Sequence, residues 1–391
     1  MPAMRTSARP ATSRSVVVAL ACVGILAAIT TIAQRYGFSA LVLDRGAVRS
    51  WLGGTGLYAY RDPLSHLGTA LSPTAALLLV PAAFLPVPVA GWLLALAGVG
   101  ALALALIAHV GPVARRYGRR RWPVVLAAGA LALTIEPIRA VLGLGTLDLL
   151  VFALVTADLV ALRRSKAAAG VGIGLATALS VSSAFFIMYL LITRQRRAAL
   201  TALATSIGAA LVAFVVTPRE NAAWFGEVLW RIDRSGPVDA LGNQSLAGVL
   251  ARLYDSSTTP VLLWLSFGML IAAVGMIRAR AAHADGDEMA AFSLVGLTAA
   301  IVGPVSFTHE LTWVLPAMVV LADAAARHLT RPRRSYREGV AMTVGAVVTY
   351  LLFVLAPMWS LRNAFAVNSY ALALILLVNA LPWRQPPLRG S

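Results

Sequence analysis

Residues Val89 to Val110 read VAGWLLALAGVGALALALIAHV, and a cluster of five arginines follows between Arg115 and Arg121. About 20 apolar residues are enough for a helix to cross a hydrocarbon core about 30 Å thick. Similar stretches, separated by short basic clusters, recur at Val16 to Ala33, Val124 to Ile138, Leu147 to Leu162, Leu200 to Val216, Pro260 to Ile277, Met289 to Val305, Leu311 to Ala326, Gly339 to Ala356 and Phe365 to Leu381. This alternation predicts an all-α polytopic membrane protein with about 10–13 transmembrane or re-entrant helices.

The composition and charge of the chain agree with this class. Hydrophobic residues make up 59% of the sequence and charged residues 13%, which excludes an ordinary soluble domain. A formal net charge of +17 would suggest nucleic acid binding in a soluble chain. Here the arginines occupy short loops between apolar stretches, and cytoplasmic loops of membrane proteins are rich in Arg and Lys. We therefore expect these clusters to mark the cytoplasmic face, and we expect no nucleic acid partner.

The charge of the loops also predicts the topology. Residues 1–14 contain three arginines and no acid, and no small-residue cleavage site follows before Gln34. An uncleaved first helix with a cytoplasmic N-terminus is therefore expected. We predict a membrane domain over residues 15–383, a cytoplasmic tail at 384–391, and two long outward loops at about 34–72 and 218–259. The single cysteine, Cys22, can form no intramolecular disulfide.

Two apolar segments are too short for the spans that their position would require. Pro73 to Pro88 is predicted to be a half-helix in the outer leaflet. Ala167 to Thr193 has basic residues at both ends, so we predict a re-entrant pair of short helices that breaks near Ser180 to Ser183. Irregular backbone at membrane depth is tolerated only where protein or a water-filled cavity covers it. The break therefore points to a functional site.

Ionisable residues inside membrane segments are functional candidates because their burial in lipid is costly. The candidates are Glu136 with Arg139, Asp148, and His309 with Glu310. Glu136 and Arg139, three residues apart, could instead neutralise each other on one helix face. The chain has no metal-ligand spacing, phosphate-binding loop or hydrolase triad, so no metal or other cofactor is firmly implied.

Several motifs recur in the order and placement of a known family. They are Gly54 to Tyr58 (GTGLY), Leu71 to Leu78 (LSPTAALL), Gly145 to Asp148 (GTLD), Gly174 to Ser183 (GLATALSVSS), Asn243 to Gly248 (NQSLAG) and Gly303 to Trp313 (GPVSFTHELTW). From Asp44 to about Trp313 the chain resembles glycosyltransferase family 87, the actinobacterial membrane mannosyltransferases that use polyprenyl-phosphate sugar donors. The resemblance implies the C-type glycosyltransferase architecture.

The chain departs from the family pattern at four motif positions. Thr146, Ser180, Ser183 and Glu310 stand where the family has Gln, Lys, Pro and the second His of a pair. The family's catalytic Asp lies near the start of the first outward loop, and counting back from the loop motif can place it at Ala40 rather than at Asp44. Asp44 is then the nearest carboxylate, about one helical turn away. The resemblance thus implies Asp44 as the general base, with Asp62 as the fallback.

A second group of residues is predicted to hold the donor phosphate and sugar. Arg suits a phosphate because of its charge and its fork of donors. The group comprises His309, Glu310, Arg139, Arg252, Asn243, Gln244, Arg49 and Tyr58. We expect Glu310 to favour the protonated form of His309. The arginines could instead extend to lipid headgroups, and Trp224, Trp230 and Trp313 could line a sugar site or belong to an interfacial belt.

The function that this resemblance implies is transfer of a mannosyl residue from a polyprenyl-phosphate donor to a glycolipid or lipoglycan on the outer face of the cytoplasmic membrane. The expected partners are the lipid-linked donor, the acceptor and membrane lipids. A catalytically impaired paralogue that binds lipid-linked glycan is one alternative. A lipid or sugar flippase is another, since transporters also use broken helices at the bilayer midplane. Another donor sugar, such as arabinofuranose, also stays open.

Overall fold

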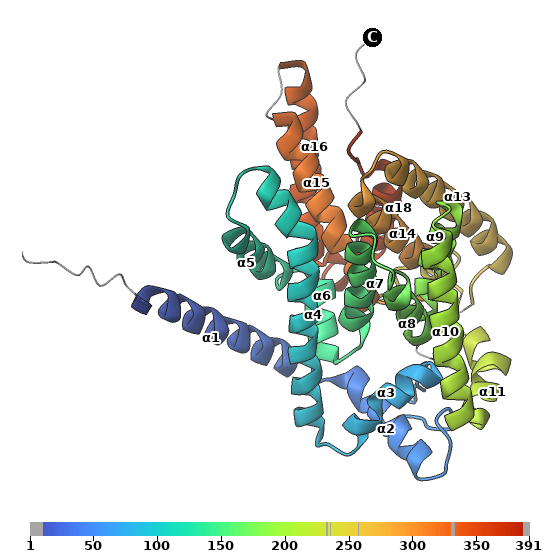
Figure 1. Cartoon of the computed structure of the whole chain (residues 1–391). Helices are drawn as coiled ribbons and strands as arrows, with labels where there is room; N and C mark the ends of the chain where they lie inside the picture. Colours follow the sequence, from blue (N-terminus) through green and yellow to red (C-terminus); the bar gives the residue numbers. More distant parts are fainter. Residues whose placement is uncertain (1–10, 232–233, 235, 257, 330–332, 386–391) are drawn as a thin grey trace, which may run out of the picture.

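The computed structural model describes residues 11–231, 234, 236–256, 258–329 and 333–385, and the regular secondary structure of this part is helical (Figure 1). Within it the only β-type pairing is an isolated bridge between Asn243 and Phe307. Four helical segments are long and apolar enough to cross a membrane, or up to six if each of two bent helix pairs is one span. The prediction of an all-α multi-pass membrane protein is therefore confirmed.

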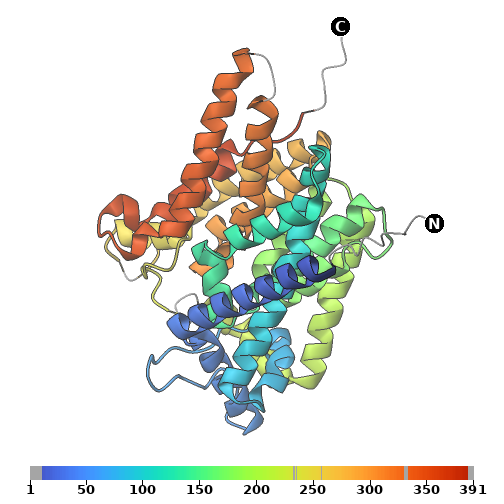
Figure 2. The ribbon, with the colours of Figure 1, turned by 90° about the vertical axis from the view of Figure 1, so that its left-hand side faces the viewer.

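Four long helical segments could each cross a membrane without a partner helix. They are α4 (Val87–Arg116), α10 (Arg196–Val216), α13 (Val261–Ala284) and α16 (Arg333–Leu355) together with η4 (Pro357–Trp359). In Figure 1 α4 and α10 stand nearly upright at two sides of the bundle. In the turned view of Figure 2, α15 (Val314–Leu329) and α16 form a hairpin that extends beyond the bundle.

The stretch Val124 to Ile138, predicted as one span, is two helices instead. α5 (Arg121–Ala132) and α6 (Glu136–Leu144) meet at an angle of 76°. Pro137 has no backbone N–H, so it could not donate to Leu133 in a continuous helix. Thr134 also forms side-chain hydrogen bonds at the bend, to the Leu131 carbonyl at 2.6 Å and to the Tyr350 hydroxyl at 2.6 Å. Hydrophobicity alone therefore overestimated the length of the continuous helix in this stretch.

The first predicted outward loop contains one helix and is followed by a short apolar helix. α1 (Ala11–Tyr36) is 26 residues long and forms the first part of one of the two bent pairs. The chain then bends by 69° into α2 (Ser39–Leu52), which lies at one end of the bundle beside α3 (Pro73–Ala83) (Figure 1). Ser72 caps α3 by accepting a hydrogen bond from the Ala75 N–H at 3.1 Å. The predicted short helix after Pro73 is thus present.

The predicted break near Ser180 is present as well. α7 (Asp148–Arg163) leads to α8 (Val171–Leu179), which ends at Ser180, where φ is −141° and ψ is 115°. A 3₁₀ turn, η1 (Val181–Ser183), follows, and α9 (Ala184–Ile192) continues from it. α8 and α9 contain nine residues each, so each is too short to cross a bilayer alone.

The centre of the bundle is α14 (Glu288–Val302), on which Met289 to Ile301 are all buried. It is packed against α9, α13, α15 and α18 (Ser369–Ala380), and against η3 (Thr308–Trp313). The stretch Phe365 to Leu381 is also interrupted, since α17 (Ala364–Val367) and α18 are separated at Asn368. The hinge between α14 and α15 therefore lies beside the most enclosed helix of the molecule.

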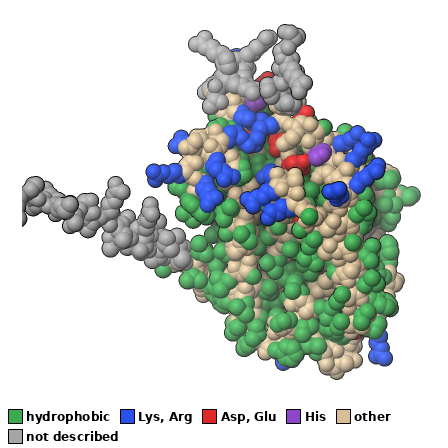
Figure 3. All heavy atoms as spheres, viewed as in Figure 1, with side chains coloured by type: hydrophobic (Ala, Val, Ile, Leu, Met, Phe, Trp, Pro, Cys, Tyr) green, Lys and Arg blue, Asp and Glu red, His purple; other side chains and the backbone are tan. Residues whose placement is uncertain are grey.

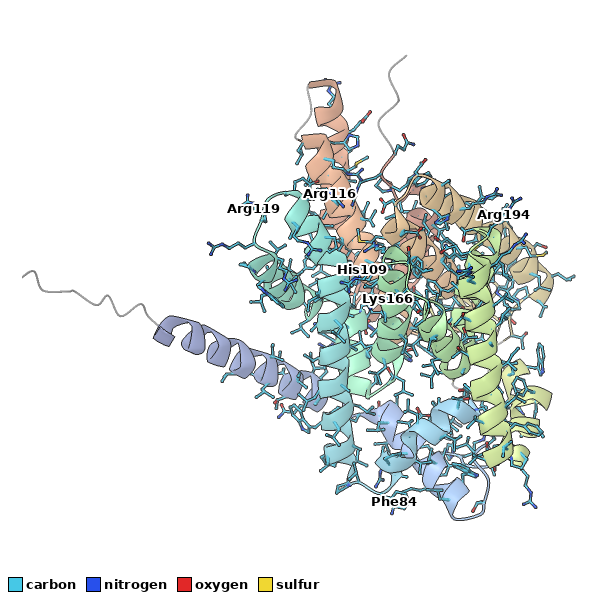
Figure 4. All side chains as sticks on the ribbon, viewed as in Figure 1. Phe84, His109, Arg116, Arg119, Lys166 and Arg194 are labelled. Carbon is cyan, nitrogen blue, oxygen red and sulfur yellow. The ribbon has the colours of Figure 1, made fainter. Side chains whose placement is uncertain are left out.

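Charge divides the molecule into two ends. Most Lys and Arg side chains visible in Figure 3 gather at the upper end, which we call the arginine end. Arg116, Arg119 and Arg194 lie there in Figure 4, whereas Phe84 lies at the opposite end, with α2 and α3. We call the latter the loop end, because the first predicted outward loop lies there. The arginines are therefore segregated to one end of the molecule, as the charge of the predicted loops indicates.

At the arginine end a buried aspartate joins three segments. The Asp323 carboxylate accepts hydrogen bonds from Arg116 of α4 at 3.0 Å and from Arg384 at 3.1 Å, and only 2% of its side chain is exposed. Trp383 donates to Asp285 at 2.7 Å. The segment that leads into the predicted C-terminal tail is therefore attached to the bundle, and residues 386–391 lie outside the described part.

Candidate active site

A cavity of about 530 Å³ lies between the loop end and the broken helix. Its lining comes from α2, the segment before α3, the start of α7, the break around Ser180, the α11–η2 region and the hinge before α15. α11 (Pro218–Gly226) and η2 (Val228–Trp230) belong to the second predicted loop, which also contains α12 (Leu246–Leu253). The lining residues are spread along the chain from Ala40 to Trp313 and surround one space, as in a ligand-binding site.

Asp44 of α2 lines this cavity. Its Oδ1 accepts a hydrogen bond from the Thr69 hydroxyl at 2.7 Å. Burial raises the pKa of Asp44 to about 6, the hydrogen bond from Thr69 acts to lower it, and the charge of Asp148 acts to raise it. A carboxylate with such a pKa is largely ionised at neutral pH and is a stronger base than an exposed aspartate.

Asp148 supplies a second carboxylate to the cavity. It is the first residue of α7, where the helix N-terminus favours negative charge. Its Oδ2 accepts a hydrogen bond from the Thr146 hydroxyl at 2.6 Å. Thr146 stands where the resembling family has Gln, and here it orients the acid.

The hinge before α15 brings His309 and Glu310 to the same cavity. His309 Nε2 lies 3.9 Å from Asp148 Oδ2, and the imidazole stacks on Phe307 at 6.0 Å. The Glu310 carboxylate instead accepts a hydrogen bond from the Phe307 N–H at 3.0 Å. The acid that faces the imidazole is therefore Asp148, which corrects the expectation that Glu310 has this role. α14 also ends at Val302, three residues earlier than predicted.

The broken helix and two tryptophans complete the wall. Ser180, Ser182 and Ser183 line the cavity, as do Trp224 and Trp313. Trp230, the third tryptophan considered for a sugar site, is 73% exposed and does not line it. Hydroxyl groups and flat aromatic faces are groups that can bind a sugar.

Asn243 and Gln244 connect the second loop to the hinge. Asn243 Oδ1 accepts from the Ser306 N–H at 3.0 Å, and the Gln244 N–H donates to the Ser306 carbonyl at 2.8 Å. Ser245 donates to the Pro304 carbonyl at 3.1 Å. These residues are buried and lie outside the cavity lining, so they position the hinge that carries His309.

The other predicted site residues lie away from this cavity. Arg252 donates to the Ala240 and Asn243 carbonyls, both at 2.8 Å, and Arg139 donates to the Val354 carbonyl at 3.2 Å. Arg49 is exposed, and Tyr58 lines a separate pocket.

Two predicted acidic residues also lie outside the cavity lining. Asp62 accepts two hydrogen bonds from Ser65 in a turn. Glu136 accepts from Thr308 at 3.2 Å, and no ion pair is seen between it and Arg139 among the described residues.

Three residues near the cavity had not been singled out from the sequence. Arg231 contributes to the lining, Thr69 holds Asp44, and Arg234 donates to the Thr69 carbonyl at 2.7 Å. Asp44, Asp148 and Glu310 give the cavity three carboxyl groups, and carboxyl groups are common metal ligands. No group of three or more His, Cys, Asp or Glu side chains suited to a metal ion occurs in the part of the chain searched.

Residues 72–306 match the profile of glycosyltransferase family 87. The chain belongs to this family. The glycosyltransferase is 31% identical over 289 residues to a polyprenol-phosphate-mannose-dependent alpha-(1-2)-phosphatidylinositol mannoside mannosyltransferase of Mycobacterium tuberculosis, covering 70% of this chain and 67% of the relative.

Two further relatives come from Mycolicibacterium smegmatis. One has the same description and is 29% identical, covering 84% of this chain and 81% of the relative. The other, a polyprenol-phosphate-mannose-dependent alpha-(1-2)-phosphatidylinositol pentamannoside mannosyltransferase, is 26% identical, covering 86% and 81%. No solved structure matches the glycosyltransferase.

Proposed function

We propose that this membrane glycosyltransferase transfers a mannosyl residue from polyprenyl-phosphate-mannose to a phosphatidylinositol mannoside or a similar glycolipid, on the outer face of the cytoplasmic membrane. Its relatives are described as using that donor and that class of acceptor. The proposal rests on one observation: Asp44, His309 and Glu310 line the same cavity, although they lie far apart in the chain. The arginine end would then be cytoplasmic, together with both termini.

In this proposal Asp44 is the general base. It accepts the proton of the acceptor hydroxyl as the oxygen bonds to the anomeric carbon and the bond from that carbon to the phosphate oxygen breaks. The electron pair of the broken bond leaves with polyprenyl phosphate. His309 and Arg231, which line the same cavity, donate hydrogen bonds to the departing phosphate.

The alternatives differ in what happens to the bond at the anomeric carbon. A catalytically impaired paralogue would bind the lipid-linked sugar and leave this bond intact, and a flippase would move the lipid without breaking it. The departures at Ser180 and Ser183 favour the first alternative. The pKa of Asp44, about 6, favours catalysis, because such a carboxylate can accept a proton at neutral pH.

The test is transfer of radiolabelled mannose from polyprenyl-phosphate-mannose to phosphatidylinositol mannosides by the purified protein in lipid nanodiscs. Loss of a positioned base costs about 10²–10⁴-fold. We expect Asp44→Asn to lose at least 10²-fold in rate and Asp62→Asn to retain the parent rate, with both variants expressed normally. Full activity of Asp44→Asn together with loss in Asp148→Asn would assign the base to Asp148 instead. No transfer by the parent protein would leave the non-catalytic alternatives.

A further inference from the structure

A second pocket of about 570 Å³ lies at the loop end, outside the active-site cavity. One wall is the segment from Trp51 to Ala59, which includes the turn after α2. The other wall is the junction of α10 and α11, from Val216 to Ala223. We call it the outer pocket. None of the roles described above for Asp44, His309 or Glu310 uses it.

An aromatic pair connects the outer pocket to the active-site cavity. Tyr58 lines the outer pocket, Trp224 lines the cavity, and their rings stack at 6.0 Å with an angle of 26° between the planes. Arg234 fixes the pair, since its guanidinium lies 5.4 Å from the centre of the Tyr58 ring and bonds the Tyr58 carbonyl. The same guanidinium bonds the Thr69 carbonyl, and Thr69 bonds Asp44. A continuous set of contacts therefore links the outer pocket to Asp44.

The chemistry of the outer pocket matches a lipid that carries sugar and phosphate. Trp51 offers an aromatic face on which a sugar ring can stack, and Arg219 offers a guanidinium for a phosphate. The carboxylate of Glu220 can accept hydrogen bonds from sugar hydroxyls.

The pocket also lies where a membrane lipid can reach it. α10 presents apolar side chains along its length, and Val212 and Val215 near its end are 63% and 79% exposed. Val216, the last residue of this helix, is also a lining residue of the pocket. A lipid whose acyl chains lie against α10 would place its headgroup at Arg219, directly beyond the apolar surface.

We propose that the outer pocket binds the sugar-phosphate headgroup of the acceptor glycolipid, while the sugar to be extended passes the Tyr58–Trp224 pair to reach Asp44. The inference rests on the proposed transferase function. It adds that the acceptor is held through its phosphate and non-reacting sugars, away from the donor site.

Kinetics with two acceptors test this assignment. One acceptor is a purified phosphatidylinositol mannoside, and the other is a short alkyl mannoside without phosphate. For Arg219→Gln and Trp51→Ala we expect KM for the phosphatidylinositol mannoside to rise about tenfold, the result of losing about 1.4 kcal/mol of binding. The KM for the donor and the rate with the alkyl mannoside should stay at the parent values. Arg362→Gln, which alters an exposed arginine outside both linings, is the matched control.

The outcomes separate this inference from the proposed function. An unchanged KM for the phosphatidylinositol mannoside in both variants overturns the outer pocket as a headgroup site, provided that the parent transfers mannose. An equal loss with both acceptors also overturns it, because damage to the fold would not depend on the headgroup. Failure of the parent to use any acceptor would instead contradict the transferase function.

Discussion

Burial and a hydrogen bond from one hydroxyl group have opposite effects on the pKa of Asp44. Thr69 donates to Asp44 Oδ1 at 2.7 Å and thereby favours the ionised form, against the effect of burial. Because the base must be ionised to accept a proton, kcat/KM should rise with pH, reach half of its plateau near pH 6, and level off above it.

Removal of that hydroxyl should move the profile in a known direction. Thr69→Val removes a hydrogen bond that lowers the pKa of Asp44, so the pKa rises and the rising limb shifts to higher pH. The variant should be slower than the parent at pH 6 and approach it at pH 8. Initial rates measured from pH 5 to 8.5 with saturating donor test this. A rate reduced by the same factor at every pH would contradict a role for Thr69 in setting the charge.

We expect His309 to donate a hydrogen bond to the departing phosphate. A hydrogen bond to a charged group contributes about 1.5–3 kcal/mol, so His309→Ala should weaken donor binding by about 10–100-fold. His309→Gln keeps a donor and should bind the lipid-linked sugar better than His309→Ala. Equal donor affinity in both variants and the parent, measured by titration of the donor, would leave a packing role against Phe307 as the better account.

The second predicted outward loop forms hydrogen bonds with two parts of the active site, the hinge that carries His309 and the first loop beside Asp44. Asn243 and Gln244 bond Ser306 in the hinge, and Arg234 bonds the first loop beside Asp44. The guanidinium of Arg234 is buried and also bonds the Tyr58 carbonyl. The loop therefore sets the distance between the base and the groups that hold the phosphate.

Substitution of Arg234 should alter the reaction more than donor binding. Arg234→Met keeps much of the side-chain volume but removes the bonds to both carbonyls, so Thr69 is no longer fixed. We expect kcat to fall about tenfold or more, KM for the donor to change little, and the pH profile to shift as in Thr69→Val. Arg234→Lys, which can keep one bond, should be intermediate. A loss of thermal stability with an unchanged kcat and pH profile would show a purely structural role.

Hydrophobic pattern and loop charge were enough to predict most helices. The break at Ser180 was predicted because two basic ends and a short apolar stretch leave no other solution. The bend in Val124 to Ile138 was missed, although Pro137 was visible in the sequence, because the hydrogen bonds of Thr134 across the bend belong to the folded state.

The candidate site was predictable only in part. Asp44, His309 and Glu310 were found from motif position and do line one cavity. Asn243 and Gln244 were expected at the donor. The Asn243 side chain instead accepts a hydrogen bond from the hinge backbone at Ser306, and the Gln244 side chain donates to the Val367 carbonyl. A sequence motif fixes the position of a residue but does not show which atoms its side chain contacts. Arg234 lies 165 residues from Thr69 in sequence, and no local pattern indicates that pairing.

For the whole molecule the decisive property is its orientation in the membrane. The arginine end should face the cytoplasm. After replacement of the single cysteine by Cys22→Ala, Gly53→Cys at the loop end should react with a membrane-impermeant thiol reagent in intact cells, whereas Arg119→Cys should react only after permeabilisation. Both positions are exposed to solvent or headgroups. Labelling of Arg119→Cys in intact cells would reverse the orientation and place the cavity on the cytoplasmic side.

The enclosure of α14 has a consequence for how the chain is made. Its neighbours include α9, which is synthesised before it, and α18, which is synthesised after it. During translation α14 therefore stays partly uncovered until α18 has left the insertion machinery. In a chain truncated before residue 369, one side of this central helix would still face lipid or the insertion machinery.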